Sequence, residues 1–122
     1  GGGCPVAIGD DGKLAGVEAV VDKDRTAALL ARLVDAEVLL ILTEVEQVLL
    51  DYGTDSERPL GEVSVAQARK LLDAGQFPAG SMGPKISAAA DVAERGGLAV
   101  ITSLGRAAEA LRGNAGTRIV SG

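Results

Sequence analysis

Two lysines in this sequence lie where a helix is expected to begin. Lys85 ends the glycine-rich stretch Gly80 to Lys85, which reads Gly-Ser-Met-Gly-Pro-Lys, and Pro84 suits the first position of a helix. A cation beside the positive end of a helix dipole is unfavourable by about 0.3–1 kcal/mol, whereas an anion bound at the free N–H groups would reverse that sign. The stretch is therefore either a phosphate-binding loop or an ordinary helix start with an exposed lysine.

The second lysine, Lys23, lies between two carboxylates. In extended backbone Asp22 and Asp24 would point to one side and Lys23 to the other. In one interpretation Lys23 contacts phosphoryl oxygens, while an aspartate orients the lysines or holds Mg²⁺. In the other, Asp24 is the N-cap of a helix, Asp22 is solvated and Lys23 lies along the surface.

The composition excludes several classes of function. The 122 residues include no histidine and one cysteine, Cys4, which excludes Ser-His-Asp and Cys-His catalysis and a zinc site of the usual kind. We assign no residue as a metal ligand. The net charge of −5 and the absence of a basic run argue against nucleic-acid binding. No apolar run reaches about 18 residues, so we expect no membrane span.

Lysines, carboxylates, backbone N–H groups and Mg²⁺ are sufficient for phosphoryl transfer, which mainly requires positioning and charge neutralisation. A single cysteine fits a reducing compartment, and the first residues show no signal peptide. The sequence therefore predicts a phosphate-binding protein located in the cytoplasm.

Apolar periodicity predicts one α/β domain over residues 1–122, with a mostly parallel sheet and right-handed crossovers. Ser64 and Gln67 form a capping box for a helix that ends at Gly75. Expected strands cover residues 5–8, 17–21, 38–42, 48–50, 98–102 and 117–120, and further helices cover residues 25–36, 84–95 and 104–111. A polar loop is expected at residues 51–59.

Polar residues follow three of the expected strands. Ligands of open α/β sheets bind beyond the carboxyl ends of the strands. Thr43 with Glu44, and Thr102 with Ser103, lie at such ends, as does the Asp-Lys-Asp motif at residues 22–24. Strand ends and helix caps are commonly polar, so Thr43, Glu44 and Ser103 are weaker indications than the two lysines.

These motifs, taken together, resemble those of carbamate kinases, which belong to the amino-acid kinase superfamily. The resemblance extends over essentially the whole chain, and its two most specific motifs are Asp-Lys-Asp and Gly-Ser-Met-Gly-Pro-Lys. The stretches that carry it occur in the family's order, at residues 1–6, 20–24, 42–45, 51–53, 80–85 and 116–119.

The resemblance implies a three-layer αβα sandwich, of which this chain is the C-terminal, nucleotide-binding half. It implies phosphoryl transfer between MgATP and carbamate, giving ADP and carbamoyl phosphate, or the reverse. In arginine-fermenting bacteria the reverse reaction completes the arginine deiminase pathway. The full-length form would be a homodimer.

The resemblance also implies roles for particular residues. Lys85 and Lys23 would contact the phosphates, with Asp22 and Asp24 organising the two lysines. The remaining assignments place the carbamoyl phosphate near Gly1, Gly2 and Gly3, and the nucleotide near Thr43, Glu44, Tyr52, Ser81, Met82 and Gly83.

The sequence departs from the family pattern at two places and in length. Glu44 to Val48 replaces the usual Asp-Val-Asp-Gly-Val, and Gln76 lies where histidine is common. Family members are roughly twice as long. Two alternatives remain open: a non-catalytic nucleotide-binding module that needs a partner half, and another amino-acid kinase acting on acetylglutamate, glutamate or a nucleoside monophosphate.

Overall fold

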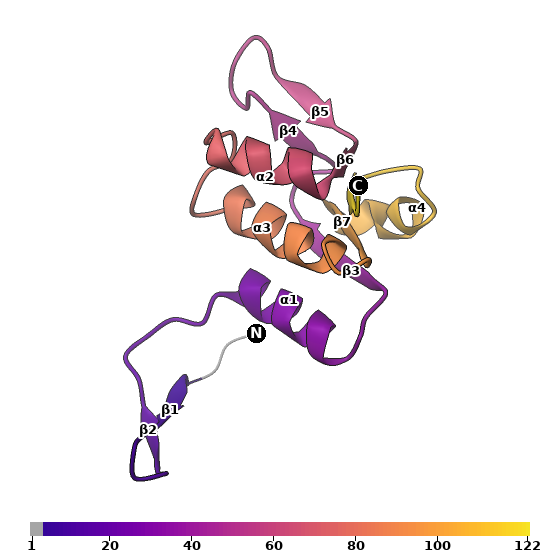
Figure 1. Ribbon diagram of the computed structural model, residues 1–122. Helices are drawn as coiled ribbons and strands as arrows, with labels where there is room; N and C mark the ends of the chain where they lie inside the picture. The colour runs from indigo at the N-terminus through magenta and orange to yellow at the C-terminus, as the bar shows by residue number, and fades with distance from the viewer. Residues whose placement is uncertain (1–3) are drawn as a thin grey trace.

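The computed structural model describes residues 4–122 and contains a four-stranded sheet, two small two-stranded sheets and several helices (Figure 1). The strands are β1 (Val6–Ile8), β2 (Leu14–Gly16), β3 (Val38–Thr43), β4 (Val48–Leu50), β5 (Arg58–Leu60), β6 (Glu62–Ser64), β7 (Leu98–Ser103) and β8 (Thr117–Val120). The helices are α1 (Lys23–Leu33), α2 (Val65–Asp73), α3 (Met82–Ala93) and α4 (Ala107–Leu111), with a 3₁₀ turn, η1 (Leu104–Arg106), before α4.

The main sheet has the order β3-β7-β8-β6. β3 is parallel to β7, β6 is parallel to β8, and β7 is antiparallel to β8. Two of its three pairings are thus parallel, which confirms the prediction of a mostly parallel sheet. Thr43 is paired with Ser103, so the carboxyl ends of β3 and β7 lie side by side.

Helices cover both faces of this sheet. α3 lies between α1 and α2 and contacts β7 and β8 (Figure 1), and Ala99 and Ile101 of β7 belong to the core cluster on that face. Val100 points to the other face, where α4 contacts β7 and its Ala110 is fully buried. Side chains alternate between the two faces of a strand, so α4 covers the face opposite α3.

Small side chains allow α3 to approach its neighbours closely. Ala88, Ala89, Ala90 and Ala93 are at most 1% exposed, and α3 packs against two helices and the sheet. Alanine loses no side-chain entropy in a helix and adds little bulk at a contact. The core is accordingly built with few aromatic residues, of which Phe77 is buried.

Several predicted boundaries are wrong. Residues 17–21 form no strand, because the hairpin places β2 at Leu14–Gly16. The expected polar loop at 51–59 includes most of β5, which pairs with β4 and is followed by β6. β5 is three residues long and contains Pro59, which cannot donate a hydrogen bond and is confined to sheet edges. The local sequence therefore gives only a weak indication of a strand there.

Among residues 4–122 no helix has both the length and the apolar character required to cross a membrane.

Candidate functional site

Asp24 lies between the two lysines singled out in the sequence. The Lys85 Nζ is 3.0 Å from Asp24 Oδ2 and 3.4 Å from Oδ1, and the Lys23 Nζ is 3.6 Å from Oδ2. The side chains of Asp24 and Lys85 are 9% and 12% exposed, whereas that of Lys23 is 67% exposed. Lys85 is therefore held in place by a buried carboxylate, while Lys23 extends into solvent.

Asp22 starts α1. Its Oδ1 accepts hydrogen bonds from the backbone N–H groups of Asp24 and Arg25, at 2.9 and 2.8 Å. The bond from the Arg25 N–H, together with the nearby charge of Lys23, lowers the pKa of the Asp22 carboxyl. The N-cap is therefore Asp22, and the alternative in which Asp24 caps the helix is wrong.

The helical register explains why Asp24 is buried. Because the helix begins at Lys23, Asp24 shares a face with Ala28 and Ala31, four and seven residues later. That face packs against α3, which carries Lys85. The expectation that Asp22 and Asp24 point to the same side of extended backbone is wrong, since Lys23 and Asp24 are already helical.

The start of α3 is fixed by a backbone carbonyl. The Pro78 carbonyl accepts hydrogen bonds from the N–H groups of Ser81 and Gly83, at 3.2 and 3.0 Å. A Cβ on Gly83 would lie 3.1 Å from the same oxygen, so the turn favours glycine there. The helix begins at Met82, so Pro84 is its third residue rather than the predicted first. Two of the N–H groups are already bonded and proline has none, so the lysines are the stronger anion-binding groups here.

The two helix starts lie at the same edge of the sheet. α1 leads into β3, α3 leads into β7, and these two strands are parallel. A helix that runs back along its strand begins near that strand's carboxyl end. The Lys85–Asp24 pair is therefore at the edge where Thr43 and Ser103 end their strands, which is where open α/β sheets bind ligands.

The other predicted site residues make fewer contacts with the Lys85–Asp24 pair. Thr43 is half-buried and Glu44 is exposed, and Tyr52 is exposed in the turn between β4 and β5. In the part of the chain that the structure describes, no hydrogen bond or ion pair joins these three to the Lys85–Asp24 pair. Ser81, Met82 and Gly83 adjoin Lys85 in sequence, and the predicted substrate residues Gly1, Gly2 and Gly3 lie outside the described residues.

Gln76 is a residue whose importance the sequence did not reveal. The Gln76 Oε1 accepts from the Asp51 N–H and its Nε2 donates to Asp51 Oδ1, both at 3.1 Å. Asp51 has a φ of 52°, and the reciprocal pair holds it in this uncommon conformation. The pair joins the turn that carries Tyr52 to the loop that leads into α3, and no local pattern relates two positions 25 residues apart.

The two carboxylates of the site already have hydrogen-bond or ion-pair partners within the protein. The Asp22 carboxylate accepts backbone N–H groups and the Asp24 carboxylate contacts both lysines. Across residues 4–122 no cluster of three or more His, Cys, Asp or Glu side chains could hold a metal ion. Both carboxylates thus have partners within the protein, and the suggestion that one of the two aspartates holds Mg²⁺ finds no support in these contacts.

Comparison with known proteins identifies the family. The model of the amino acid kinase family matches residues 2–103. The chain belongs to the amino acid kinase family. It is 48% identical to the carbamate kinase of Pyrococcus furiosus over 98% of this chain and 38% of that protein. It is 46% identical to the carbamate kinase of Halobacterium salinarum, again over 98% of this chain and 39% of the relative.

Solved structures agree with this assignment. The carbamate kinase from Giardia lamblia bound to AMP-PNP superimposes with a TM-score of 0.91 at 39% identity, over 97% of this chain and 41% of that one. The predicted α/β fold with a mostly parallel sheet is thus confirmed, and it matches the fold of that carbamate kinase. The chain spans less than half the length of the kinases it matches, and the roles of its individual site residues stay predictions.

Proposed function

We propose that this chain is the C-terminal, nucleotide-binding half of a carbamate kinase built as a three-layer αβα sandwich. The complete enzyme would transfer a phosphoryl group reversibly between MgATP and carbamate, giving ADP and carbamoyl phosphate. The observation that carries the proposal is the buried Asp24–Lys85 pair with Lys23 beside it, in a chain 48% identical to a carbamate kinase.

The charge of the cluster suits phosphoryl transfer. Lys23 and Lys85 flank the Asp24 carboxylate. Lys23 and Arg25 lie near the Asp22 carboxylate, so three cations and two carboxylates leave a net positive charge at the edge of the sheet. In the transition state negative charge is spread over the oxygens of the transferred group, and positioned cations stabilise it. Lys85 is held by Asp24, so less of its rotamer entropy remains to be lost when it binds a phosphate. Exposed Lys23 retains its freedom to move onto the same group.

The remaining residues would bind the rest of the substrates. We assign the nucleotide to Thr43, Glu44, Tyr52 and the segment Ser81 to Gly83, and carbamoyl phosphate to Gly1, Gly2 and Gly3. Mg²⁺ would enter as part of MgATP, coordinated by the nucleotide's phosphates and water. A cytoplasmic location, a homodimeric full-length form and a role in arginine breakdown belong to the same proposal.

A second candidate function is a non-catalytic nucleotide-binding module. The observation in its favour is that the matched segment is only 38% of the Pyrococcus furiosus relative. Calorimetric titration of the 122-residue chain with MgADP, together with an assay of ATP formation from ADP and carbamoyl phosphate, separates the two. Binding without turnover favours the module for the isolated chain, and absence of binding contradicts both candidates.

Catalysis is tested in a chimera in which this chain replaces the matched segment of the Pyrococcus furiosus kinase. In that chimera we expect Lys85→Ala to lower kcat by about 10²–10³-fold, because an electrostatic group that faces the developing charge is lost. Lys70→Ala in the last turn of α2 makes the same change in net charge and is expected to leave kcat unchanged. Near-normal turnover of Lys85→Ala would contradict the assignment.

A further inference from the structure

The loop that joins β3 to β4, residues 44–47, depends on side chains for its conformation. Its four residues form neither helix nor strand. Among residues 4–122, no backbone–backbone hydrogen bond beyond those of the helices and strands involves them. The loop follows Thr43 directly, at the carboxyl edge of the sheet. Because its backbone groups are not paired in regular structure, the side chains that bind the loop determine where it lies.

Two buried threonines bind the end of this loop. The Thr102 Oγ1 donates to the Glu46 carbonyl at 3.0 Å, and the Thr117 Oγ1 accepts from the Val48 N–H at 2.9 Å. Thr117 also donates to the Leu60 carbonyl, so it binds both strands of the β4–β5 hairpin. Burial of a hydroxyl costs free energy unless it is hydrogen-bonded. Both hydroxyls are fully buried, and both use their hydrogen bonds to hold this loop and the hairpin against the main sheet.

The positions of the two threonines in their strands relate them to the loop rather than to core packing. The other fully buried residues of β7 and β8 are apolar, namely Ala99, Val100, Ile101 and Ile119. Thr102 is near the carboxyl end of β7, and Thr117 begins β8, where it pairs with Ile101. The buried polar residue of each strand is therefore at the edge of the sheet where the loop lies.

Two further contacts come from side chains nearer the surface. The Gln47 Nε2 donates to the Gly116 carbonyl at 3.2 Å. The Arg106 Nε is 3.7 Å from Glu46 Oε2, an ion pair without a hydrogen bond, and its Nη1 is 2.6 Å from Glu109 Oε2. Since Arg106 belongs to η1, directly after β7, the loop is held from β7, β8 and η1 together.

We propose that Thr102, Thr117 and Arg106 are positioning residues for the nucleotide. They hold residues 44–47 so that the side chains of this loop, and those of the β4–β5 hairpin beyond it, meet the nucleotide, and they do not contact the reacting phosphate. This inference rests on the proposed function, which assigns the nucleotide to these segments. The two lysines are held by Asp24 rather than by the loop. Loosening the loop therefore weakens nucleotide binding and leaves the phosphoryl-transfer step unchanged.

Calorimetric titration of the 122-residue chain with MgADP measures the effect on binding. We expect Thr102→Val to raise Kd about tenfold, because the Glu46 carbonyl loses its donor and the loop is no longer fixed. The control is Ile119→Val, which removes a methylene from the buried part of β8, lowers stability and should leave Kd unchanged. An unchanged Kd for Thr102→Val would overturn the proposal. Equal rises for the two variants would also overturn it, because they would reflect lost stability alone.

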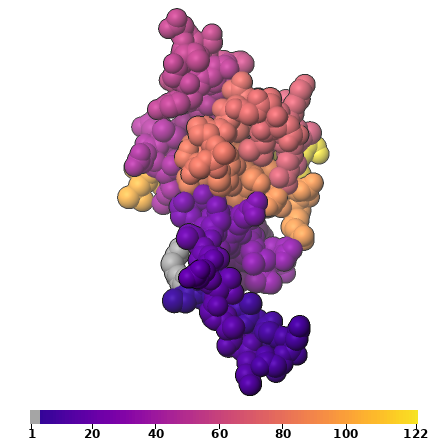
Figure 2. Space-filling model, turned by 90° about the vertical axis from the view of Figure 1, so that its left-hand side faces the viewer, coloured from indigo at the N-terminus to yellow at the C-terminus, as the bar shows by residue number. Residues whose placement is uncertain are grey.

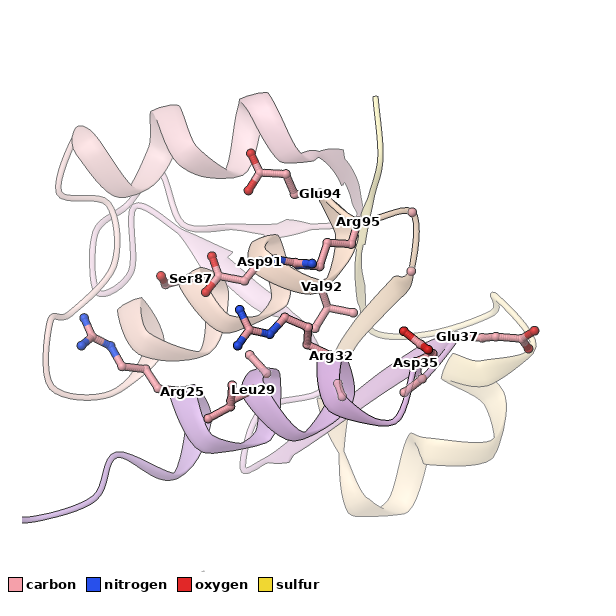
Figure 3. Close-up of a pocket in the computed structure, with 15 residues that line it drawn as sticks. Arg25, Leu29, Arg32, Asp35, Glu37, Ser87, Asp91, Val92, Glu94 and Arg95 are labelled. Carbon is pink, nitrogen blue, oxygen red and sulfur yellow. The ribbon is translucent and has the colours of Figure 1, made fainter. Parts of the chain in front are cut away.

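A second variant tests the contact at the surface in a chain that keeps its core. Arg106→Gln removes the ion pair with Glu46 and should raise Kd about threefold, and Arg106→Lys, which keeps the charge, should recover most of the affinity. The matched control is Arg69→Gln. Arg69 also bridges two carboxylates, those of Asp91 and Glu94, which line an open groove between α1 and α3 (Figure 3). This control should leave Kd unchanged, and an equal rise in both glutamine variants would contradict the proposal.

Steady-state kinetics of the chimera with the Pyrococcus furiosus kinase separates positioning from catalysis. Thr102→Val should raise KM for MgADP about tenfold and change kcat by less than about twofold. A fall in kcat at unchanged KM would place Thr102 in the reaction step and overturn the proposal. If the natural chain binds no MgADP and its chimera is inactive, the proposed function fails and this inference fails with it. Natural binding and turnover that Thr102→Val leaves unaltered contradict the positioning role alone.

Discussion

Large apolar side chains are mostly exposed in the region up to β3 and mostly buried in the region from β4 onward. In the later region Val48, Ile86, Ile101 and Ile119 are fully buried. In the earlier region the hairpin β1–β2 extends away from the body of the molecule (Figure 2), and Val20 is 97% exposed. What differs is the number of covering layers, since α3 is enclosed by two helices and a sheet and α1 is covered on one face.

The comparison indicates that stability is concentrated in the later region. An isolated two-stranded hairpin is marginal in water, and exposed apolar side chains contribute little to folding. Local opening should therefore be easiest in the hairpin and hardest around α3. The Asp24–Lys85 pair connects α1 with α3, so the candidate site lies on the boundary between the two regions.

The largest expected effect contrasts a core position with an exposed one. Ile86→Ala should lower the free energy of unfolding by about 2–5 kcal/mol, because it leaves a cavity in a fully packed core. Leu33→Ala on α1 should change it by no more than about 0.5 kcal/mol. Urea unfolding of both variants checks the contrast, and similar losses would show that the earlier region is as well packed as the later one.

The next effect concerns the connection between two loops of the later region. Gln76→Ala removes both hydrogen bonds to Asp51 and should cost about 1–3 kcal/mol in the free energy of unfolding. If the turn with Tyr52 contributes to nucleotide binding, the affinity for MgADP falls several-fold as well. Gln67→Ala, which removes the side chain of an exposed capping box, is the matched control and should not alter that affinity.

The parts of the fold that the sequence predicted depend on local patterns. The strands at 38–42 and 98–102 are apolar on both faces, and the capping box of Ser64 and Gln67 needs only residues three apart; both features are present. The side-chain contacts of the candidate site depend instead on how the helices pack. Lys85 is 61 residues from Asp24, so their contact follows from the packing of α1 on α3.

The N-cap of α1 shows that local sequence is also insufficient to predict a contact between residues close together in the chain. Asp22 and Asp24 are both good capping residues, and the local sequence does not decide between them. The decision comes from the alanine face of α1, because packing Ala28 and Ala31 on α3 also turns Asp24 inward and leaves Asp22 at the cap. Tertiary contacts therefore selected which of two identical side chains became the partner of Lys85.

A smaller effect is expected from replacing Asp22, the N-cap of α1. Asp22→Ala should lower the free energy of unfolding by less than Gln76→Ala does, since two N–H groups of α1 lose their acceptor but remain accessible to water. The pKa of Asp22 is lowered from 3.8 by the Arg25 N–H bond, so its ionised form stabilises the fold above pH 3.8 and that contribution is lost as the pH falls through the lowered value. The difference in free energy of unfolding between the natural chain and Asp22→Asn should therefore become smaller as the pH falls. A difference that stays constant with pH would contradict this account.

The smallest effect is expected in the hairpin. Ile8 is 74% exposed, so Ile8→Thr should change the free energy of unfolding of the isolated chain by less than about 0.5 kcal/mol. Amides of β1 should exchange at rates close to those of an unfolded peptide, because two strands without a covering layer open readily. Strong protection of β1, or a loss above 1–2 kcal/mol, would mean that the hairpin packs on the body, and the contrast between the two regions would then apply only to α1 and β3.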